Sequence, residues 1–177
     1  MKKLLSILTI ILACGVLSAC GSTSESNPTQ ISIIENVEQF SRISKKELKN
    51  IMGKPTTKET WTNKTSKGNF KVATWSYDKN SNHYEFIIAD DSVIRLSIYS
   101  NNYWNGKGDR FAIDDTKERI CESFGITLGD NVKSVTNNNS TYTLSPVNEK
   151  VAMFDVQDID SNTYGFVKIT YNLNYFD

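Results

Sequence analysis

The stretch His83-Tyr-Glu-Phe-Ile-Ile-Ala-Asp-Asp-Ser-Val-Ile-Arg-Leu-Ser-Ile-Tyr99 has the alternating pattern of an antiparallel β-hairpin. Apolar residues occupy every second position on both sides of Asp90-Asp91, which is a short turn signal. One predicted face carries Tyr84, Phe86, Ile88, Ile94, Leu96 and Ile98. The opposite face carries His83, Glu85, Ile87, Arg95, Ser97 and Tyr99. We therefore expect a sheet with one apolar face and one more polar face.

A helix is predicted just before this hairpin. Ser44-Lys45-Lys46-Glu47 fits a capping box, in which Ser44 and Glu47 satisfy each other's backbone amides. Leu48, Ile51 and Met52 then share one face, and Gly53 followed by Pro55 ends the helix. We expect this apolar helix face to cover the apolar side of the hairpin.

The same order of helix, glycine stop and strands can be found a second time. A second helix is predicted from Asp114 or Asp115 to Gly125, with Asp115 and Glu118 as its capping box. Further strands are predicted over residues 70–77, 142–144, 150–157 and 164–173. The sequence therefore predicts an α+β fold with helices packed on antiparallel sheet, arranged as two tandem helix-plus-sheet units, residues 31–105 and 106–177. The alternative is a chance alignment of two helices that both end at glycine.

The run from Ile43 to Pro55 resembles the helix-to-turn segment of the BamE/SmpA and β-lactamase-inhibitor-protein-like (BLIP-like) lipoproteins. This resemblance implies tandem units whose sheets form a concave protein-binding face. The second predicted unit has Gly125-Ile126-Thr127 where that motif has Gly-x-Pro. The motif specifies a fold more than a function.

The N-terminus resembles the signal segment of bacterial lipoproteins. Lys2 and Lys3 precede a short apolar run, and Leu17-Ser18-Ala19-Cys20 resembles the lipobox. The resemblance implies that residues 1–19 are removed, that a diacylglyceryl lipid is joined to the Cys20 thiol, and that residues 20–30 form a flexible tether. It places the chain on the extracytoplasmic face of a bacterial cell membrane. An ordinary secretory signal with a chance cysteine is the alternative.

Charge and composition argue against several classes of function. Removal of residues 1–19 would leave a net charge of −2, and the lysines form no continuous basic block, so we expect no nucleic-acid binding. The chain has one histidine, His83, and Cys121 would be the one free thiol of the processed protein. The paired aspartates do not match calcium-binding spacing. We expect no catalytic residues, no metal site and no cofactor, although an enzyme that uses Cys121 and His83 stays an alternative.

Aromatic residues provide the best candidates for a binding surface. We expect Tyr99, Trp104 and Trp75 to form an interaction face, because aromatic side chains are enriched where proteins meet. The leading hypothesis is a non-enzymatic, membrane-anchored lipoprotein whose sheet face binds a protein partner at the cell envelope. The alternative is a binding or envelope-sensing domain for a small ligand such as a peptide or glycan.

Overall fold

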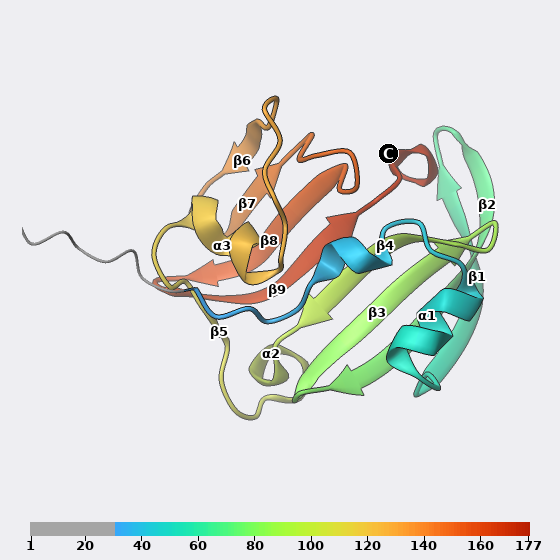
Figure 1. The fold of residues 1–177 in the computed structure, drawn as a ribbon, viewed down its shortest axis with the longest axis horizontal. Helices are drawn as coiled ribbons and strands as arrows, with labels where there is room; N and C mark the ends of the chain where they lie inside the picture. Colours follow the sequence, from blue (N-terminus) through green and yellow to red (C-terminus); the bar gives the residue numbers. More distant parts are fainter. Residues whose placement is uncertain (1–30) are drawn as a thin grey trace, which may run out of the picture.

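Residues 31–177, which the computed structural model describes, form one antiparallel sheet of nine strands. Eight strands follow the order β1-β2-β3-β4-β9-β8-β7-β6, and β5 pairs with β9 beside the residues that pair with β4. The strands are β1 (Thr57–Thr65), β2 (Gly68–Lys79), β3 (Asn82–Ala89), β4 (Ser92–Tyr99), β5 (Phe111–Ala112), β6 (Ser134–Asn137), β7 (Thr141–Leu144), β8 (Met153–Asp160) and β9 (Thr163–Thr170). Figure 1 shows β4 and β9 side by side.

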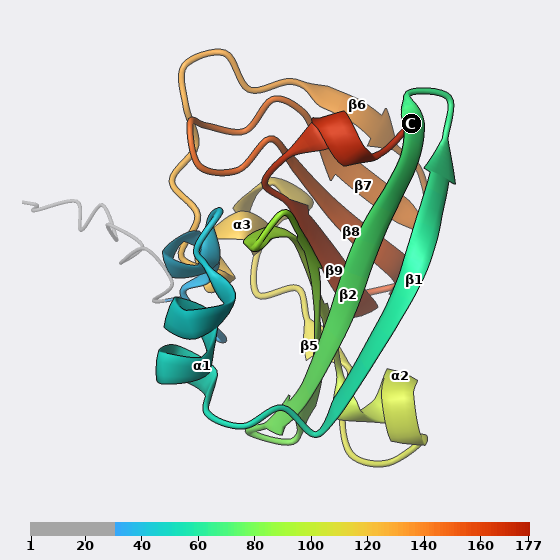
Figure 2. The same cartoon turned by 90° about the vertical axis from the view of Figure 1, so that its right-hand side faces the viewer.

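Short helices lie on both sides of this sheet. They are η1 (Val37–Phe40), α1 (Lys45–Met52), α2 (Asn101–Asn105), η2 (Lys117–Arg119), α3 (Ile120–Ser123) and η3 (Leu173–Tyr175). Figure 2 shows η1, α1 and α3 on one side of the sheet and α2 on the other. We call the first side the helix face and the second side the open face.

The predicted fold class of two tandem helix-plus-sheet units is wrong. Backbone pairing between β4 and β9, from Arg95 opposite Thr170 to Tyr99 opposite Phe166, joins the strands of both halves into one sheet. A single core of buried side chains follows the helix face from Trp75 in β2 to Leu144 in β7. The halves therefore share one core.

Only the first predicted helix has its predicted length and cap, although Ile51 of its predicted apolar face is 44% exposed. In α1, the Ser44 amide donates to Glu47 Oε2 at 2.9 Å and the Glu47 amide donates to Ser44 Oγ at 3.3 Å, which completes the capping box. The second helix is reduced to η2 and the four residues of α3. Its predicted cap residue Asp115 accepts from Arg119 at 2.6 Å, and the N-cap of η2 is Thr116, which makes no side-chain cap hydrogen bond.

The predicted hairpin is present as β3 and β4, joined at Asp90 and Asp91, which both have positive φ. One detail differs from strict alternation. The register shifts at Ile88, which pairs with Val93, so Ile94 turns to the open face. There Ile94 packs with Val72, Ala89 and Phe176 in a small second cluster. A β-bulge of this kind adds one residue to a strand and reverses the alternation beyond it.

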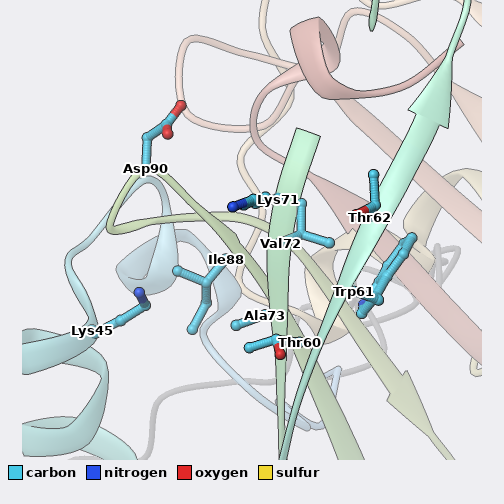
Figure 3. A pocket seen from close by; sticks show the side chains of 9 residues that line it. All are labelled: Lys45, Thr60, Trp61, Thr62, Lys71, Val72, Ala73, Ile88 and Asp90. Carbon is cyan, nitrogen blue, oxygen red and sulfur yellow. The ribbon is translucent and has the colours of Figure 1, made fainter. Parts of the chain in front are cut away.

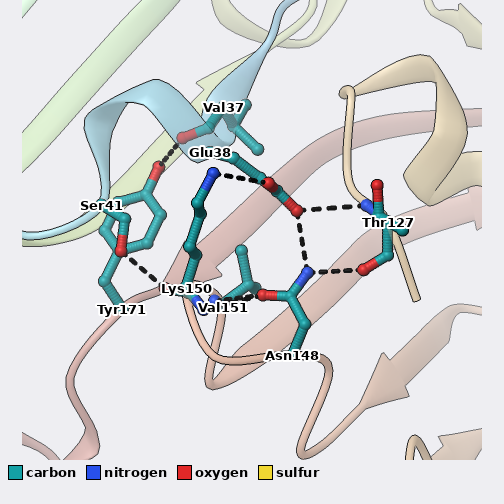
Figure 4. Close-up of polar contacts among 8 residues, drawn as sticks. All are labelled: Val37, Glu38, Ser41, Thr127, Asn148, Lys150, Val151 and Tyr171. Atoms are coloured by element: carbon teal, nitrogen blue, oxygen red, sulfur yellow. Dashed lines mark hydrogen bonds and ion pairs between the residues drawn. The ribbon is translucent and has the colours of Figure 1, made fainter. Parts of the chain in front are cut away.

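A polar network fixes η1 to loops from the second half of the chain (Figure 4). Glu38 accepts from the Thr127 amide at 3.1 Å, from Asn148 Nδ2 at 2.8 Å and from Lys150 Nζ at 3.2 Å. The Tyr171 hydroxyl donates to the Val37 carbonyl at 2.7 Å. Burial alone would raise the pKa of Glu38, but these donors lower it below its ordinary value. Contacts across more than 80 residues thus hold the two halves together.

Candidate functional site

Five aromatic rings gather on the open face, and we call them the aromatic cluster: His83, Tyr99, Tyr103, Trp104 and Phe166. Three of them form a row across neighbouring strands, because His83 pairs with Tyr99 and Tyr99 pairs with Phe166. Directly opposed residues in antiparallel strands bring their side chains close together on one face. Strand register therefore places the base of the cluster.

Helix α2 lays the other two rings over this row. Ser100 caps the helix by accepting from the Tyr103 amide at 3.3 Å, and Gly106 ends it with a left-handed φ of 66°. The Trp104 ring lies flat on His83, with a centroid separation of 3.8 Å and an interplanar angle of 4°. Tyr103 packs on Phe166 at 4.8 Å. The short helix thus carries two rings that are held in place by packing on the row of rings from the sheet.

A glycine makes the position of Tyr103 possible. At Gly165 in β9, a Cβ atom would lie 2.5 Å from Tyr103 Cδ2 and 2.8 Å from Asp158 Oδ2. Arg110 fixes the loop after α2 by donating to Asp158 Oδ2 at 2.8 Å and to Thr163 Oγ1 at 3.1 Å. Any larger side chain at position 165 would push Tyr103 away from the sheet.

The cluster is partly buried and partly exposed. His83 is 7% exposed, whereas Tyr103 and Trp104 are 43% and 45% exposed. The outer surfaces of these two rings therefore contact solvent while their inner surfaces pack on the row below. Rigid, half-exposed Trp and Tyr side chains are typical of residues that anchor binding partners.

Two carboxylates surround His83 beneath Trp104. Its Nδ1 lies 2.7 Å from Asp78 Oδ1, and its Nε2 lies 3.8 Å from Glu85 Oε1. Glu85 also accepts from the Tyr99 hydroxyl at 2.9 Å. Burial lowers the pKa of His83, but Glu85 and Asp78 outweigh this effect and raise it above its ordinary value. The nearby His83 ring in turn lowers the pKa of Glu85.

We expect the stabilising effect of His83 to depend on pH. Because its pKa is raised in the folded protein, its contribution is complete below its ordinary value of 6.5 and is lost as the pH rises through the folded value. The contribution of Glu85 to stability has the opposite dependence. It is present above 4.5, the ordinary pKa of this carboxyl, and is lost as the pH falls through the lower pKa of the folded protein. His83→Gln should therefore lower the free energy of unfolding more at about pH 5.5 than at about pH 8.5. Urea unfolding of both proteins at the two pH values measures this difference, and an equal loss at both would contradict the assignment.

The structure does not bring Cys121 and His83 together. Cys121 is fully buried in the core of the helix face, where its thiol donates to the Glu118 carbonyl at 3.2 Å, whereas His83 lies on the open face. Burial raises the pKa of the Cys121 thiol to about 11. A thiol that stays protonated near neutral pH is a poor nucleophile. This geometry gives the Cys121–His83 alternative no support.

Of the predicted interaction residues, the structure unites two and separates one. Tyr99 and Trp104 are neighbours, with ring centroids 5.2 Å apart. Trp75 lies instead on the helix face, 9% exposed, with Lys58 Nζ 4.2 Å from its ring centroid. Trp75 pairs with Phe86 across β2 and β3, which assigns it to the core face. The predicted lipidation residue, Cys20, lies outside the described residues.

Two members of the site were missed as binding residues: Phe166 and His83. The alternation of the hairpin already placed His83 and Tyr99 on one face, so their pairing could have been found from the sequence. The position of Phe166 could not be predicted, because it depends on the long-range register between β4 and β9.

Within residues 31–177, no group of three or more His, Cys, Asp and Glu side chains is placed to bind a metal ion. In the same range, no helix is both long enough and apolar enough to cross a membrane.

Comparison with known proteins does not assign a family. No family model and no curated protein matches the chain. The resemblance to BamE/SmpA and BLIP-like proteins is wrong, because one continuous nine-stranded sheet replaces the tandem units that it implies.

Three solved chains are similar to this one, among them the following two. One is an extracellular protein containing an SCP domain from Bacillus anthracis, with a TM-score of 0.41 and 9% identity over 84% of this chain and 49% of that chain. The other is a cysteine-rich secretory protein from Staphylococcus aureus, with a TM-score of 0.39 and 8% identity over 81% of this chain and 51% of that chain. The chain thus spans about half the length of each.

Proposed function

We propose that this chain is a non-enzymatic, lipid-anchored protein of the extracytoplasmic cell surface that binds a protein partner through the aromatic cluster. The observation that carries the proposal is the pair Tyr103 and Trp104, which expose 43% and 45% of their surface while packed against a row of side chains on the sheet. Such rings need little further ordering when a partner binds, so less conformational entropy is lost.

The surroundings of the cluster favour a protein partner. Binding hot spots are rich in Trp, Tyr and Arg, and they act best in patches from which water is excluded on binding. Here the exposed rings stand beside the half-buried Glu85 and Lys168, which supply polar contacts at the rim. The sheet beneath them is a rigid support built from β3, β4 and β9.

The membrane anchor rests on the sequence before the described residues. Leu17-Ser18-Ala19-Cys20 supports lipid attachment at Cys20, and residues 20–30 provide a tether to the sheet. A single acyl chain binds a membrane only marginally, whereas two chains give stable anchoring. A diacylglyceryl group supplies the two chains.

Trp104→Ala tests the proposed binding face. We expect the variant to keep its fold and to lose at least about 2 kcal/mol of binding free energy, about thirtyfold in Kd, as for a truncated hot-spot residue. The measurement is chemical cross-linking on native membranes, followed by affinity determination with the recovered partner. Leu128→Ala is the control, since Leu128 is 42% exposed but lies outside the cluster.

Three results would count against the proposal. One is the recovery of no reproducible partner, and another is equal recovery with Trp104→Ala and with the wild type. The third is binding of a glycan or free peptide to the cluster that accounts for the entire effect of the variant, which would support the small-ligand alternative. Backbone amide NMR shifts on adding oligosaccharides identify that outcome.

A further inference from the structure

Positive charge is concentrated at one end of the molecule. The segment from Lys45 to Lys71 contains eight lysines and two glutamates, a net charge of +6, whereas residues 72–177 have a net charge of −6. The lysines are too widely spaced to form a block in the sequence, and the fold brings them together. Helix α1, strand β1 and the start of β2 lie at the same side of the molecule (Figure 1).

Strand β1 is a long and regular sheet edge. Its nine residues pair with β2 without a register shift, and no described strand pairs with its outer side. Seven of the nine residues are exposed. The opposite edge, β6, has only four residues and a register shift. Most proteins shorten, bend or cover their edges, because a regular free edge can pair with another strand.

The helix-face side of β1 opens onto a hollow of about 480 Å³ (Figure 3). Lys45 of α1 and Lys71 of β2 extend toward the same space, and Ala73 and Ile88 also line it. Neither lysine forms an ion pair with any residue from 31 to 177. Asp90 also borders the hollow, but its carboxylate accepts from the Tyr175 hydroxyl at 2.6 Å.

Further lysines of β1 share this side. Lys71 pairs with Thr62 and Trp75 pairs with Lys58, so Lys58, Thr60, Thr62 and Lys64 alternate along the helix-face side of the strand. Lys58 and Lys64 are both exposed and, within the described chain, have no carboxylate partner. An added strand would set its alternate side chains beside these residues.

We propose that the outer edge of β1 binds an extended acidic segment of a partner protein by strand addition. The backbone of that segment pairs with β1, and its acidic side chains, on alternate positions, face Lys58, Lys64 and the two lysines of the hollow. This site uses residues that are separate from the aromatic cluster, so either site can be tested without the other.

A second copy of the chain fits this edge poorly. If two β1 strands pair antiparallel with all nine residues overlapping, Trp61 lies at the centre. Lys58 of each copy then lies opposite Lys64 of the other copy. Like charges directly opposite each other are destabilising. The other edge cannot supply the acidic strand either, because β6 consists of Ser134, Val135, Thr136 and Asn137.

A designed peptide tests the proposal with the full-length protein in nonionic detergent. The probe is a capped nine-residue peptide of alternating Glu and Val, and its affinity is measured by isothermal titration calorimetry. A second peptide has Gln in place of Glu, and a third is the Glu peptide with alternate amides methylated. We expect the Lys58→Gln/Lys64→Gln protein, and both altered peptides, to bind at least about tenfold more weakly.

Lys107→Gln/Lys133→Gln is the matched control, since it removes the same charge from exposed lysines outside this edge. We expect the control protein to bind the probe within about twofold of the wild type at about 0.15 M salt. The proposal is overturned if the Glu peptide does not bind, if both double variants weaken binding equally, or if the methylated peptide binds as well as the parent. Formation of dimers in sedimentation runs without peptide would show that β1 pairs with a second copy instead.

Discussion

Phe86→Ala is expected to destabilise the whole protein by about 3–5 kcal/mol, a large part of the stability of an ordinary domain. Phe86 is fully buried on the helix face of β3. Its ring packs edge-to-face against Phe40 of η1 at 5.0 Å and against Tyr77 of β2 at 5.6 Å. Truncation to alanine removes these contacts and leaves a cavity in the shared core. Urea unfolding followed by circular dichroism and by tryptophan fluorescence measures the loss.

The shape of that transition also tests the continuous sheet. Because β4 and β9 join the two halves, both probes should report one transition, displaced to lower urea concentration in the variant. Ile51→Ala is the control, since Ile51 is 44% exposed on α1 and its truncation should change stability by about 0.5 kcal/mol or less. Two separate transitions, with only one affected by Phe86→Ala, would indicate two independent units.

Cys20→Ala is expected to abolish stable membrane association. Each buried methylene of a lipid contributes about 0.8 kcal/mol, so loss of two acyl chains removes nearly all of the anchoring free energy. The variant should appear in the medium or remain unprocessed in the cell, and its membrane-bound fraction should fall at least about tenfold. Cell fractionation measures the distribution, and intact mass spectrometry measures the lipid and the processing.

Cys14→Ala is the matched control for this prediction. Cys14 lies in the same segment but outside the Leu17-Ser18-Ala19-Cys20 run, so its substitution should leave both lipid attachment and membrane association unchanged. If the Cys20→Ala protein keeps the wild-type mass and the wild-type membrane fraction, Cys20 carries no lipid and the anchor proposal fails.

Local sequence patterns identified the local parts of the fold. The β3–β4 hairpin follows from alternation around Asp90-Asp91, and α1 follows from its capping box and its glycine stop. The joining of β4 to β9 could not be found in this way, because it pairs residues more than 65 positions apart. The helix-and-glycine repeat therefore suggested two units where long-range pairing makes one.

The sequence pattern also could not predict β1, because this strand has no apolar face. Strand β1, Thr-Lys-Glu-Thr-Trp-Thr-Asn-Lys-Thr, lies at an edge with most of its side chains exposed, so its sequence lacks the alternation of a half-buried strand. Its β propensity comes from four threonines and Trp61. Helix α2 was not predicted for a different reason. It has only five residues between its caps Ser100 and Gly106, which is too few for a helical repeat of apolar residues to be recognised.

The candidate site was partly predictable for the same physical reasons. Tyr99 and Trp104 were named as interaction residues, and the structure places them in contact. Trp75 was misplaced because the register of β2 against β3, which sets its face, could not be read from β2 alone. The lysines beside the outer edge of β1 were not predicted to form a site. They are scattered over residues 45–71 and become neighbours only when α1, β1 and β2 pack together.

Site-specific photo-cross-linking in living cells tests whether the aromatic cluster binds a protein partner. A photoreactive phenylalanine analogue is placed at position 103 in one protein and at position 128 in another, both exposed in the structure. We expect one reproducible cross-linked protein from position 103, lost when Trp104→Ala is added, and none from position 128. Equal cross-linking from both positions, or none from position 103, would contradict the claim that the aromatic cluster binds a protein partner.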